Sequence, residues 1–168
     1  DIQISDVVRA QAAVLGNNPV NIANWVKNSI EWIPSWGSVQ GSELTLVNRR
    51  GNAIDIASLT IAMLRAAGVP ARYVLGTVEI PAAKLANWVG GAQDVDTALS
   101  LLQQGGIATS ALIEGGRIKT VAMEHAWVQA FVNWAPSRGA KQGGNAVNPS
   151  VQYQGLAQHV NPNGNLNA

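Results

Sequence analysis

Few side chains in this sequence are able to do nucleophilic or acid–base chemistry near neutral pH. The chain has no cysteine, and its imidazoles are those of His125 and His159. The absence of cysteine excludes disulfides and thiolate metal ligands, so we expect neither a metal site nor a cofactor. His125 lies in an alternating segment that is typical of a strand, and a lone histidine on a strand is more often a hydrogen-bonded core residue than a catalyst.

The sequence between Asn52 and Gly68 predicts a buried helix around which the rest of the chain is organised. Asn52 is a favourable N-cap, and Gly68 is a favourable residue just after a helix C-terminus. Apolar side chains occur on nearly every side between them, which is typical of a helix in the middle of a domain. Pro70 cannot continue the helix, and residues 72–75 (Arg-Tyr-Val-Leu) predict a strand.

Residues 50–76 resemble the core of transglutaminase-like domains, which are relatives of the papain-type cysteine hydrolases. The family pattern is Gly-Asn-Cys, an aspartate two residues later, a buried helix, and then Leu-Arg-Ala-x-Gly-Ile-Pro-Ala-Arg-Tyr-Val-x-Gly, which residues 64–76 match almost letter for letter. Residues 123–130 resemble the family's Glu-His-x-Trp-Val-Glu-Ala, and residues 148–150 resemble its Asp-Pro-Ser. The resemblance extends from residue 19 to residue 153 and is closest to domains attached to bacterial Rhs-type polypeptides.

The resemblance implies a cysteine–histidine site in which the nucleophile position holds an alanine. The family's cysteine falls at Ala53, the base at His125, and the residue that orients the imidazole at Asn148, where the family has aspartate. We then expect the Ala53 methyl roughly 4 to 5 Å from a ring nitrogen of His125, because a sulfur there would need hydrogen-bond reach. Alanine closes the covalent route, and Ser58 and Thr60 lie too far along the helix to replace the nucleophile.

Four further residues are candidates for binding a ligand in the groove beside this site: Trp36, Gln40, Trp88 and Trp127. Trp36 lies in a loop, where it would either pack in the core or form the wall of a groove, and we weigh these two alternatives equally. For the neighbouring Trp32 we expect core packing.

Residues 81–120 predict an insertion between two core strands. Glycine pairs punctuate this part of the chain, a helix is expected over 94–104, and a hairpin with a tight glycine turn over 112–118. Such insertions often cover a binding site. We expect this one to pack beside the cleft as a lid, with Trp88 near the rim.

Together these patterns predict an α+β fold, in which an antiparallel sheet packs on the buried central helix and N-terminal helices pack alongside. We expect one domain over residues 1–160 and a poorly ordered tail over residues 161–168. The remaining expected elements are helices over 6–15 and 19–33, a helical or extended piece over 42–46, a strand over 123–132 and a short last strand over 147–153.

The composition bears on partners and location. The formal net charge is +1 and 12% of residues are charged, which gives no reason to expect nucleic acid or an anionic membrane as a partner. No apolar run reaches the roughly 18 residues of a membrane span. The chain starts at Asp1 without a signal peptide, so we expect a mature form or an excised domain. The compartment stays open, and the resemblance favours a secreted or cell-envelope bacterial location.

Three hypotheses for function follow. The first is a pseudoenzyme that binds an extended peptide or protein segment, or packs within a larger bacterial secreted polypeptide. The second is an active transglutaminase or peptide amidase whose cysteine was changed to alanine. The third is a purely structural domain.

Overall fold

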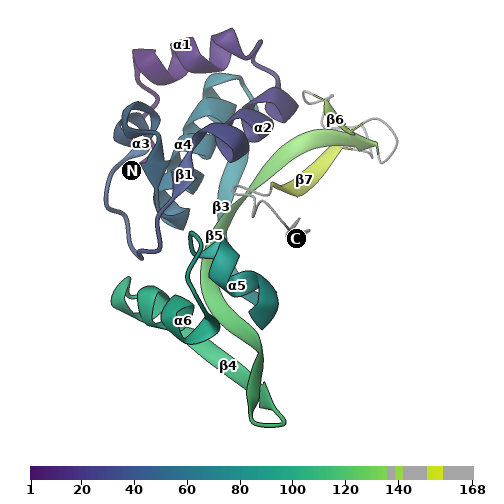
Figure 1. The fold of residues 1–168 in the computed structure, drawn as a ribbon. Helices are drawn as coiled ribbons and strands as arrows, with labels where there is room; N and C mark the ends of the chain where they lie inside the picture. The colour runs from purple at the N-terminus through teal and green to yellow at the C-terminus, as the bar shows by residue number, and fades with distance from the viewer. Residues whose placement is uncertain (136–138, 142–150, 157–168) are drawn as a thin grey trace.

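A computed structural model describes residues 1–135, 139–141 and 151–156 (Figure 1). The helices are α1 (Asp6–Val14), α2 (Pro19–Ser29), α3 (Ser42–Asn48), α4 (Ala53–Ala66), α5 (Ala82–Trp88) and α6 (Val95–Gln104). The strands are β1 (Glu31–Trp32), β2 (Arg50–Gly51), β3 (Ala71–Pro81), β4 (Thr109–Glu114), β5 (Arg117–Ala135), β6 (Gly139–Lys141) and β7 (Val151–Leu156).

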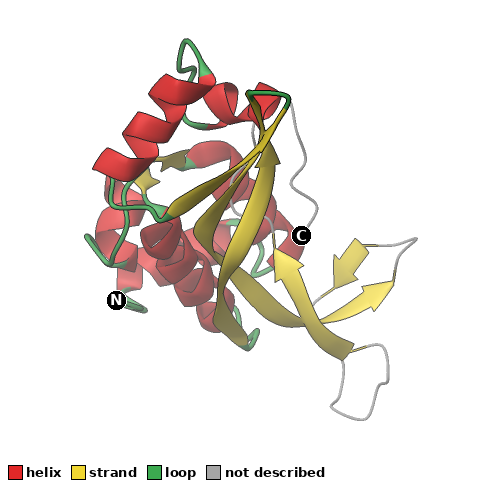
Figure 2. Ribbon diagram, turned by 90° about the horizontal axis from the view of Figure 1, so that it is seen from below, coloured by secondary structure: helices red, strands yellow, loops and turns green. Residues whose placement is uncertain are grey.

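The long strand β5 organises the main sheet. It pairs antiparallel with β3 in an unbroken register from Ala71↔Ala130 to Pro81↔Thr120. On its other side it pairs with β4 near its start and with β7 and β6 near its end. The strands are strongly twisted, and the hairpin of β4 and β5 projects at one end of the sheet (Figure 2). The expected α+β fold, an antiparallel sheet packed on a central helix, is confirmed.

Helix α4 has the ends that its sequence predicts. The Asn52 side chain accepts hydrogen bonds from the backbone N–H groups of Ile54 and Asp55, and the Asp55 carboxylate accepts one from the Asn52 N–H, which completes a capping box. At the other end Gly68 has a φ of +76°, and the Val69 N–H bonds back to the Leu64 carbonyl at 2.8 Å. Both expected caps are confirmed.

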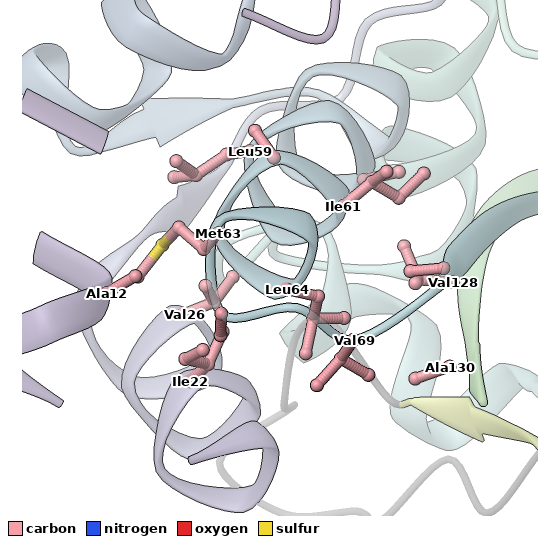
Figure 3. Packing of buried hydrophobic residues seen from close by; sticks show 14 of the residues in the cluster. Ala12, Ile22, Val26, Leu59, Ile61, Met63, Leu64, Val69, Val128 and Ala130 are labelled. Atoms are coloured by element: carbon pink, nitrogen blue, oxygen red, sulfur yellow. The ribbon is translucent and has the colours of Figure 1, made fainter. Parts of the chain in front are cut away.

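The main hydrophobic core surrounds α4, as expected for a helix that is apolar on nearly all sides. Met63 points to Ala12 of α1, and Leu64 points to Val69, while Ile22 and Val26 of α2 belong to the same cluster (Figure 3). The side chains at 128, 130 and 132 of β5 complete the core and are fully buried. The helix is therefore enclosed by N-terminal helices on one side and by the sheet on the other.

A second core cluster forms where α5 and α6 pack on the other end of β3 and β5. Figure 1 shows α1–α4 around one half of β5 and α5, α6 and β4 around the other half. Along β5 the buried positions are odd-numbered through His125 and even-numbered from Ala126 on. Since the register with β3 is unbroken there, the two clusters cover opposite faces of the same strand.

Several expected elements are present and differ in extent. The helix over 94–104 is α6, with Asp94 as its N-cap, and the glycine-turn hairpin is the β4–β5 connection, where Gly115 and Gly116 both have positive φ. Strands β3 and β5 are longer than expected. A last strand is present over 151–156 and overlaps the expected 147–153, of which residues 147–150 lie outside the described residues.

One expected helix is wrong in its extent. The second helix ends at Ser29 rather than at residue 33, because Ile30 is extended, with a φ of −113° and a ψ of 119°. Glu31 and Trp32 instead form β1, which pairs in parallel with β2. The helical spacing of Ile30 and Ile33 is thus a coincidence of two apolar residues that lie beyond the helix. The proposed tail at 161–168 lies outside the described residues.

Candidate functional site

Ala53 is the first residue of α4, directly after the Asn52 cap, and is 4% exposed. The position predicted for the nucleophile is therefore at a helix N-terminus, the location that favours a thiolate in cysteine enzymes. The side chain there is a methyl group. Ser58 and Thr60 do not replace it, because their hydroxyls are buried and donate to the backbone carbonyls of Ile54 and Ile56 within the helix.

The loop over residues 33–40 wraps around this helix end and is held by the two capping side chains. One Asp55 carboxylate oxygen accepts the backbone N–H groups of Val39 and Gln40, each at 3.0 Å. The Asn52 amide donates to the Gly37 carbonyl at 2.7 Å. Asp55 is 2% exposed. The local capping motif of α4 thus also positions a loop that lies 15 to 16 residues earlier in the chain.

Gln40, one of the residues predicted to bind a ligand, has structural partners. Its side-chain amide donates to the Arg50 carbonyl, and its side-chain oxygen accepts from the Asn48 amide at 2.9 Å. These bonds fix the Gln40 side chain against the turn that leads into α4. Its role in ligand binding stays a prediction.

His125 is 5% exposed and lies at the end of the second core cluster. Its ring meets the Trp88 ring edge to face, with centroids 5.8 Å apart. Burial lowers the pKa of His125 to about 4, because the cationic form would lose its hydration. At neutral pH the imidazole is therefore uncharged and a weak base, with one ring nitrogen able to donate a hydrogen bond and the other able to accept one.

A chain of contacts connects the start of α4 with His125. Trp32 of β1 pairs with Gly51, two residues before Ala53. The Trp32 ring packs on Trp88 with centroids 4.2 Å apart, and Trp88 in turn packs on His125. Two tryptophans thus bridge the two predicted catalytic positions. The expected separation between Ala53 and His125 stays a prediction.

A hollow of about 250 Å³ lies beside the His125 strand and is lined by Trp36, Leu75, Gly76, Thr77 and Glu124. We call it the Trp36–Glu124 pocket. Gly76 pairs with His125 in the sheet, and Thr77 pairs with Glu124. Trp36 lines this hollow and also packs against the second core cluster, so it shows features of both expected alternatives. Its binding role stays a prediction.

The other predicted residues are distributed as follows. Trp88 is 5% exposed and packs in the second core, so it lies in the interior rather than at a rim. Trp127 is half-buried and its ring covers Gly76, where an added Cβ would lie 2.8 Å from the ring. Trp32 packs against both cores, as expected. Asn148 and His159 lie outside the described residues.

The sequence interpretation overlooked Leu75 and Glu124 as pocket residues. The sequence predicted Leu75 only as a strand residue. Its exposed position in the pocket lining is known only from the structure, where 65% of its surface is accessible. Glu124 precedes the candidate histidine and faces the opposite side of the strand. Within the described ranges, no group of three histidine or carboxylate side chains could hold a metal ion. None of the described helices has both the length and the apolar character to cross a bilayer.

The lowered pKa of His125 predicts a stability that depends on pH. The unfolded chain protonates this imidazole near pH 6.5 and the folded chain only near 4, so the unfolded state takes up more protons between these values. The free energy of unfolding should therefore fall as the pH is lowered. From pH 7 to pH 5 we expect a loss of about 2 kcal/mol that His125→Phe does not show.

Urea unfolding of the wild-type protein and of His125→Phe at several pH values measures this difference. The contribution of the carboxylates is the same in both proteins and cancels when the two free energies of unfolding are subtracted. Phenylalanine keeps an aromatic ring against Trp88 and removes the titrating group. Parallel pH profiles for the two proteins would contradict the assignment.

Comparison with known proteins is consistent with this architecture. The model of the transglutaminase-like superfamily matches residues 3–141. Among curated proteins, an uncharacterized protein of Mycobacterium leprae (strain TN), ML0607, is 38% identical over 58 residues. The aligned part is 34% of this chain and 21% of the relative, so the chain matches about a fifth of that protein. No solved structure matches the chain significantly. With most of its length matched by the family model, the chain belongs to the transglutaminase-like superfamily.

Proposed function

We propose that this domain is a transglutaminase-like pseudoenzyme that binds an extended polypeptide segment and does no thiol chemistry. The observation that carries the proposal is Ala53, a buried methyl group at the start of a fully capped α4. Acyl transfer through a covalent intermediate needs a nucleophile at this position, and the chain has no cysteine to supply one.

The surroundings of Ala53 support a binding role rather than loss of all function. The capping box of α4 and the loop over residues 33–40 form a complete hydrogen-bonded framework. The Trp36–Glu124 pocket is open next to this framework, with an aromatic ring and an exposed leucine in its lining. Ligand sites are mostly apolar hollows with a few polar groups, and the pocket has this composition.

The bound segment is a peptide or protein strand, and the rest of the domain's own polypeptide is the candidate that we favour. The segment shared with the mycobacterial protein is 34% of this chain and 21% of that protein, which is longer than the chain described here. We further propose that the domain is carried within a larger secreted bacterial polypeptide of the Rhs type. Neither nucleic acid nor a membrane is part of this proposal.

Replacing Ala53 with cysteine tests the absence of thiol chemistry. We expect the Ala53→Cys thiol to alkylate with iodoacetamide no faster than free cysteine at pH 7.5, and to give no turnover of glutamine peptides with a primary amine. The side chain at position 53 is only 4% exposed, which shields a thiol there from reagents, and a misplacement of the catalytic groups by about 1 Å can cost ~100-fold in rate. Alkylation in denaturant gives the reference rate.

The same variant decides between this proposal and a trapped enzyme. An enzyme that lost only its sulfur keeps its base and its oxyanion donors, so restoring the sulfur would give a fast-reacting thiol and a trapped acyl intermediate. Rapid turnover by Ala53→Cys would overturn the pseudoenzyme. The same outcome would establish the second hypothesis, an amidase or transglutaminase with the cysteine exchanged for alanine.

Peptide binding is tested separately by nuclear magnetic resonance. A mixture of capped heptapeptides of random sequence should shift the indole N–H signals of Trp36 and Trp127. Trp25 serves as an internal control, because it lies on α2 under the Arg49 guanidinium, 4.5 Å from it, and does not line the pocket. Equal shifts at all three indoles, or none, would favour the purely structural domain.

A further inference from the structure

Building on the proposed peptide-binding role, we infer that the Trp36–Glu124 pocket selects one long cationic side chain, lysine or arginine, of the bound segment. The pocket combines an aromatic ring, an exposed aliphatic side chain and a carboxylate in a space of about 250 Å³. That volume is just below the roughly 300–1,000 Å³ of pockets that hold whole small ligands. It fits a single side chain of an extended chain.

The apolar lining matches the stem of such a side chain. Leu75 is 65% exposed, although it is a large aliphatic residue on a strand. Trp36, from the loop over residues 33–40, lines the same pocket as the strand residues. Lysine and arginine bury their methylene stems on surfaces of this kind and keep the charged head at the polar end. A cation near the face of the Trp36 indole would gain further attraction from the ring.

The polar lining matches the head. The Glu124 side chain is exposed and forms no ion pair with any described residue, whereas Glu114 is paired with Lys119. Thr77 pairs with Glu124 in the sheet, and Glu79 lies two residues further along β3 on the same face. Two carboxylates thus lie diagonally across adjacent strands, within the range at which long side chains interact. This face carries negative charge that a cationic side chain would neutralise.

The contacts of Trp36 hold the pocket in place. Its backbone N–H donates to the Gly105 carbonyl at 2.8 Å, at the end of α6. The loop that bears Trp36 is also fixed to α4 through Asp55, as described above. The pocket wall is therefore supported from both cores, and a site that is formed in advance loses less entropy on binding.

The test uses capped heptapeptides of the sequence Thr-Val-Thr-X-Thr-Val-Thr, in which X is lysine, arginine, norleucine or glutamate. Norleucine is the matched control, because it keeps the aliphatic stem and lacks the charge. We expect the lysine and arginine peptides to bind at least about ten-fold more tightly than the norleucine peptide. The glutamate peptide should bind more weakly than norleucine, and added salt should reduce the preference.

Protein variants locate the selectivity. Glu124→Gln should weaken the lysine peptide about five-fold and leave the norleucine peptide within about two-fold. Glu79→Gln removes the same charge from the same face outside the pocket lining, and should change lysine binding by about two-fold at most. Both glutamates are exposed, so neither change is expected to affect folding. Leu75→Ala should weaken all of the peptides, whereas Leu112→Ala, at an exposed leucine outside the pocket, should not.

Each outcome decides between the two proposals. Equal binding of the lysine and norleucine peptides would overturn the charge selection and leave the peptide-binding role intact. Equal losses in Glu124→Gln and Glu79→Gln would show that the whole face attracts cations, which would overturn the pocket as the selective site. Absence of binding by every peptide, with no shift of the Trp36 indole, would overturn both proposals.

Discussion

Asp55→Ala is expected to destabilise the domain by about 4 kcal/mol, because three backbone N–H groups lose a charged acceptor. The Asp55 carboxylate accepts the N–H groups of Val39 and Gln40 at 3.0 Å and that of Asn52 at 3.4 Å. The Asp55 side chain itself is 2% exposed. Hydrogen bonds to a charged group contribute about 1.5–3 kcal/mol each. Two bonds of ordinary length and one long bond therefore account for an expected loss of about 4 kcal/mol in the free energy of unfolding.

Two variants separate this hydrogen-bond role from a general effect of charge at a helix end. Asp55→Asn keeps an oxygen for both loop N–H groups and loses the acceptor for Asn52, so we expect roughly half the loss. Asp6→Ala removes an exposed acid from the first turn of α1 and should cost at most about 1 kcal/mol. Urea unfolding measures all three. Equal losses for Asp55→Ala and Asp6→Ala would refute the loop-anchoring role.

The Asp55 variant also has a local signature. If the carboxylate holds the loop over residues 33–40, the amide hydrogens of Val39 and Gln40 should exchange much faster in Asp55→Ala, under conditions where α4 remains folded. The loop carries Trp36, so the lysine peptide should also bind more weakly to this variant. Unchanged exchange at Val39 and Gln40 would place the loss of stability elsewhere.

Gly105→Ala is expected to destabilise the domain by about 3 kcal/mol, since overpacking costs about 1–3 kcal/mol and one hydrogen bond is lost as well. Gly105 has a φ of −74°, which any residue adopts, so its backbone does not require glycine. Glycine is required here because there is no space for a side chain: an added Cβ would lie 1.8 Å from the Pro34 carbonyl oxygen. Backbone atoms on both sides must move apart, and the bond from the Trp36 N–H to Gly105 lies in the same contact.

Gly41→Ala is the matched control for this prediction. Gly41 also has an ordinary φ, of −63°. The nearest atom to its added Cβ is the end of the flexible Gln3 side chain, at 2.7 Å, and the nearest backbone atom is the Asp1 carbonyl oxygen, at 3.1 Å rather than the 1.8 Å at Gly105. That side chain can rotate away, so we expect a loss below about 1 kcal/mol. Thermal unfolding of both variants gives the comparison. A Gly105→Ala protein as stable as Gly41→Ala would show that the two cores are not packed closely at Pro34.

Local sequence patterns account for the parts of this protein that depend on neighbouring residues. Asn52 and Asp55 cap α4 from within a single turn, and Gly68 ends it by a local change of φ. Asp94 does the same for α6, and the paired glycines at 115 and 116 form the hairpin turn. The family motifs also identified the central helix and the His125 strand. Each of these features depends on contacts within a few residues, which a sequence pattern records directly.

The tertiary structure alone decided the features that depend on distant contacts. The second helix ends at Ser29 because Glu31 and Trp32 pair with residues 50 and 51, which the apolar spacing of the helix could not reveal. Trp88 is buried because it packs between Trp32 and His125, from three separate elements. Asp55 anchors a loop 15 residues away. The capping box explains an aspartate at this position even if no loop were bound, so the sequence could not reveal the second role.

The buried side of β5 is the clearest case. Its alternating sequence predicts two faces, but not that one face is covered at the start of the strand and the other at its end. That change follows from two separate cores packing on opposite faces of one long strand. Because the buried face changes along β5, Leu75 and Glu124 stay exposed and line the pocket together with Trp36. Strand periodicity fixes which residues share a face, whereas burial of that face depends on which helices the rest of the chain brings to it.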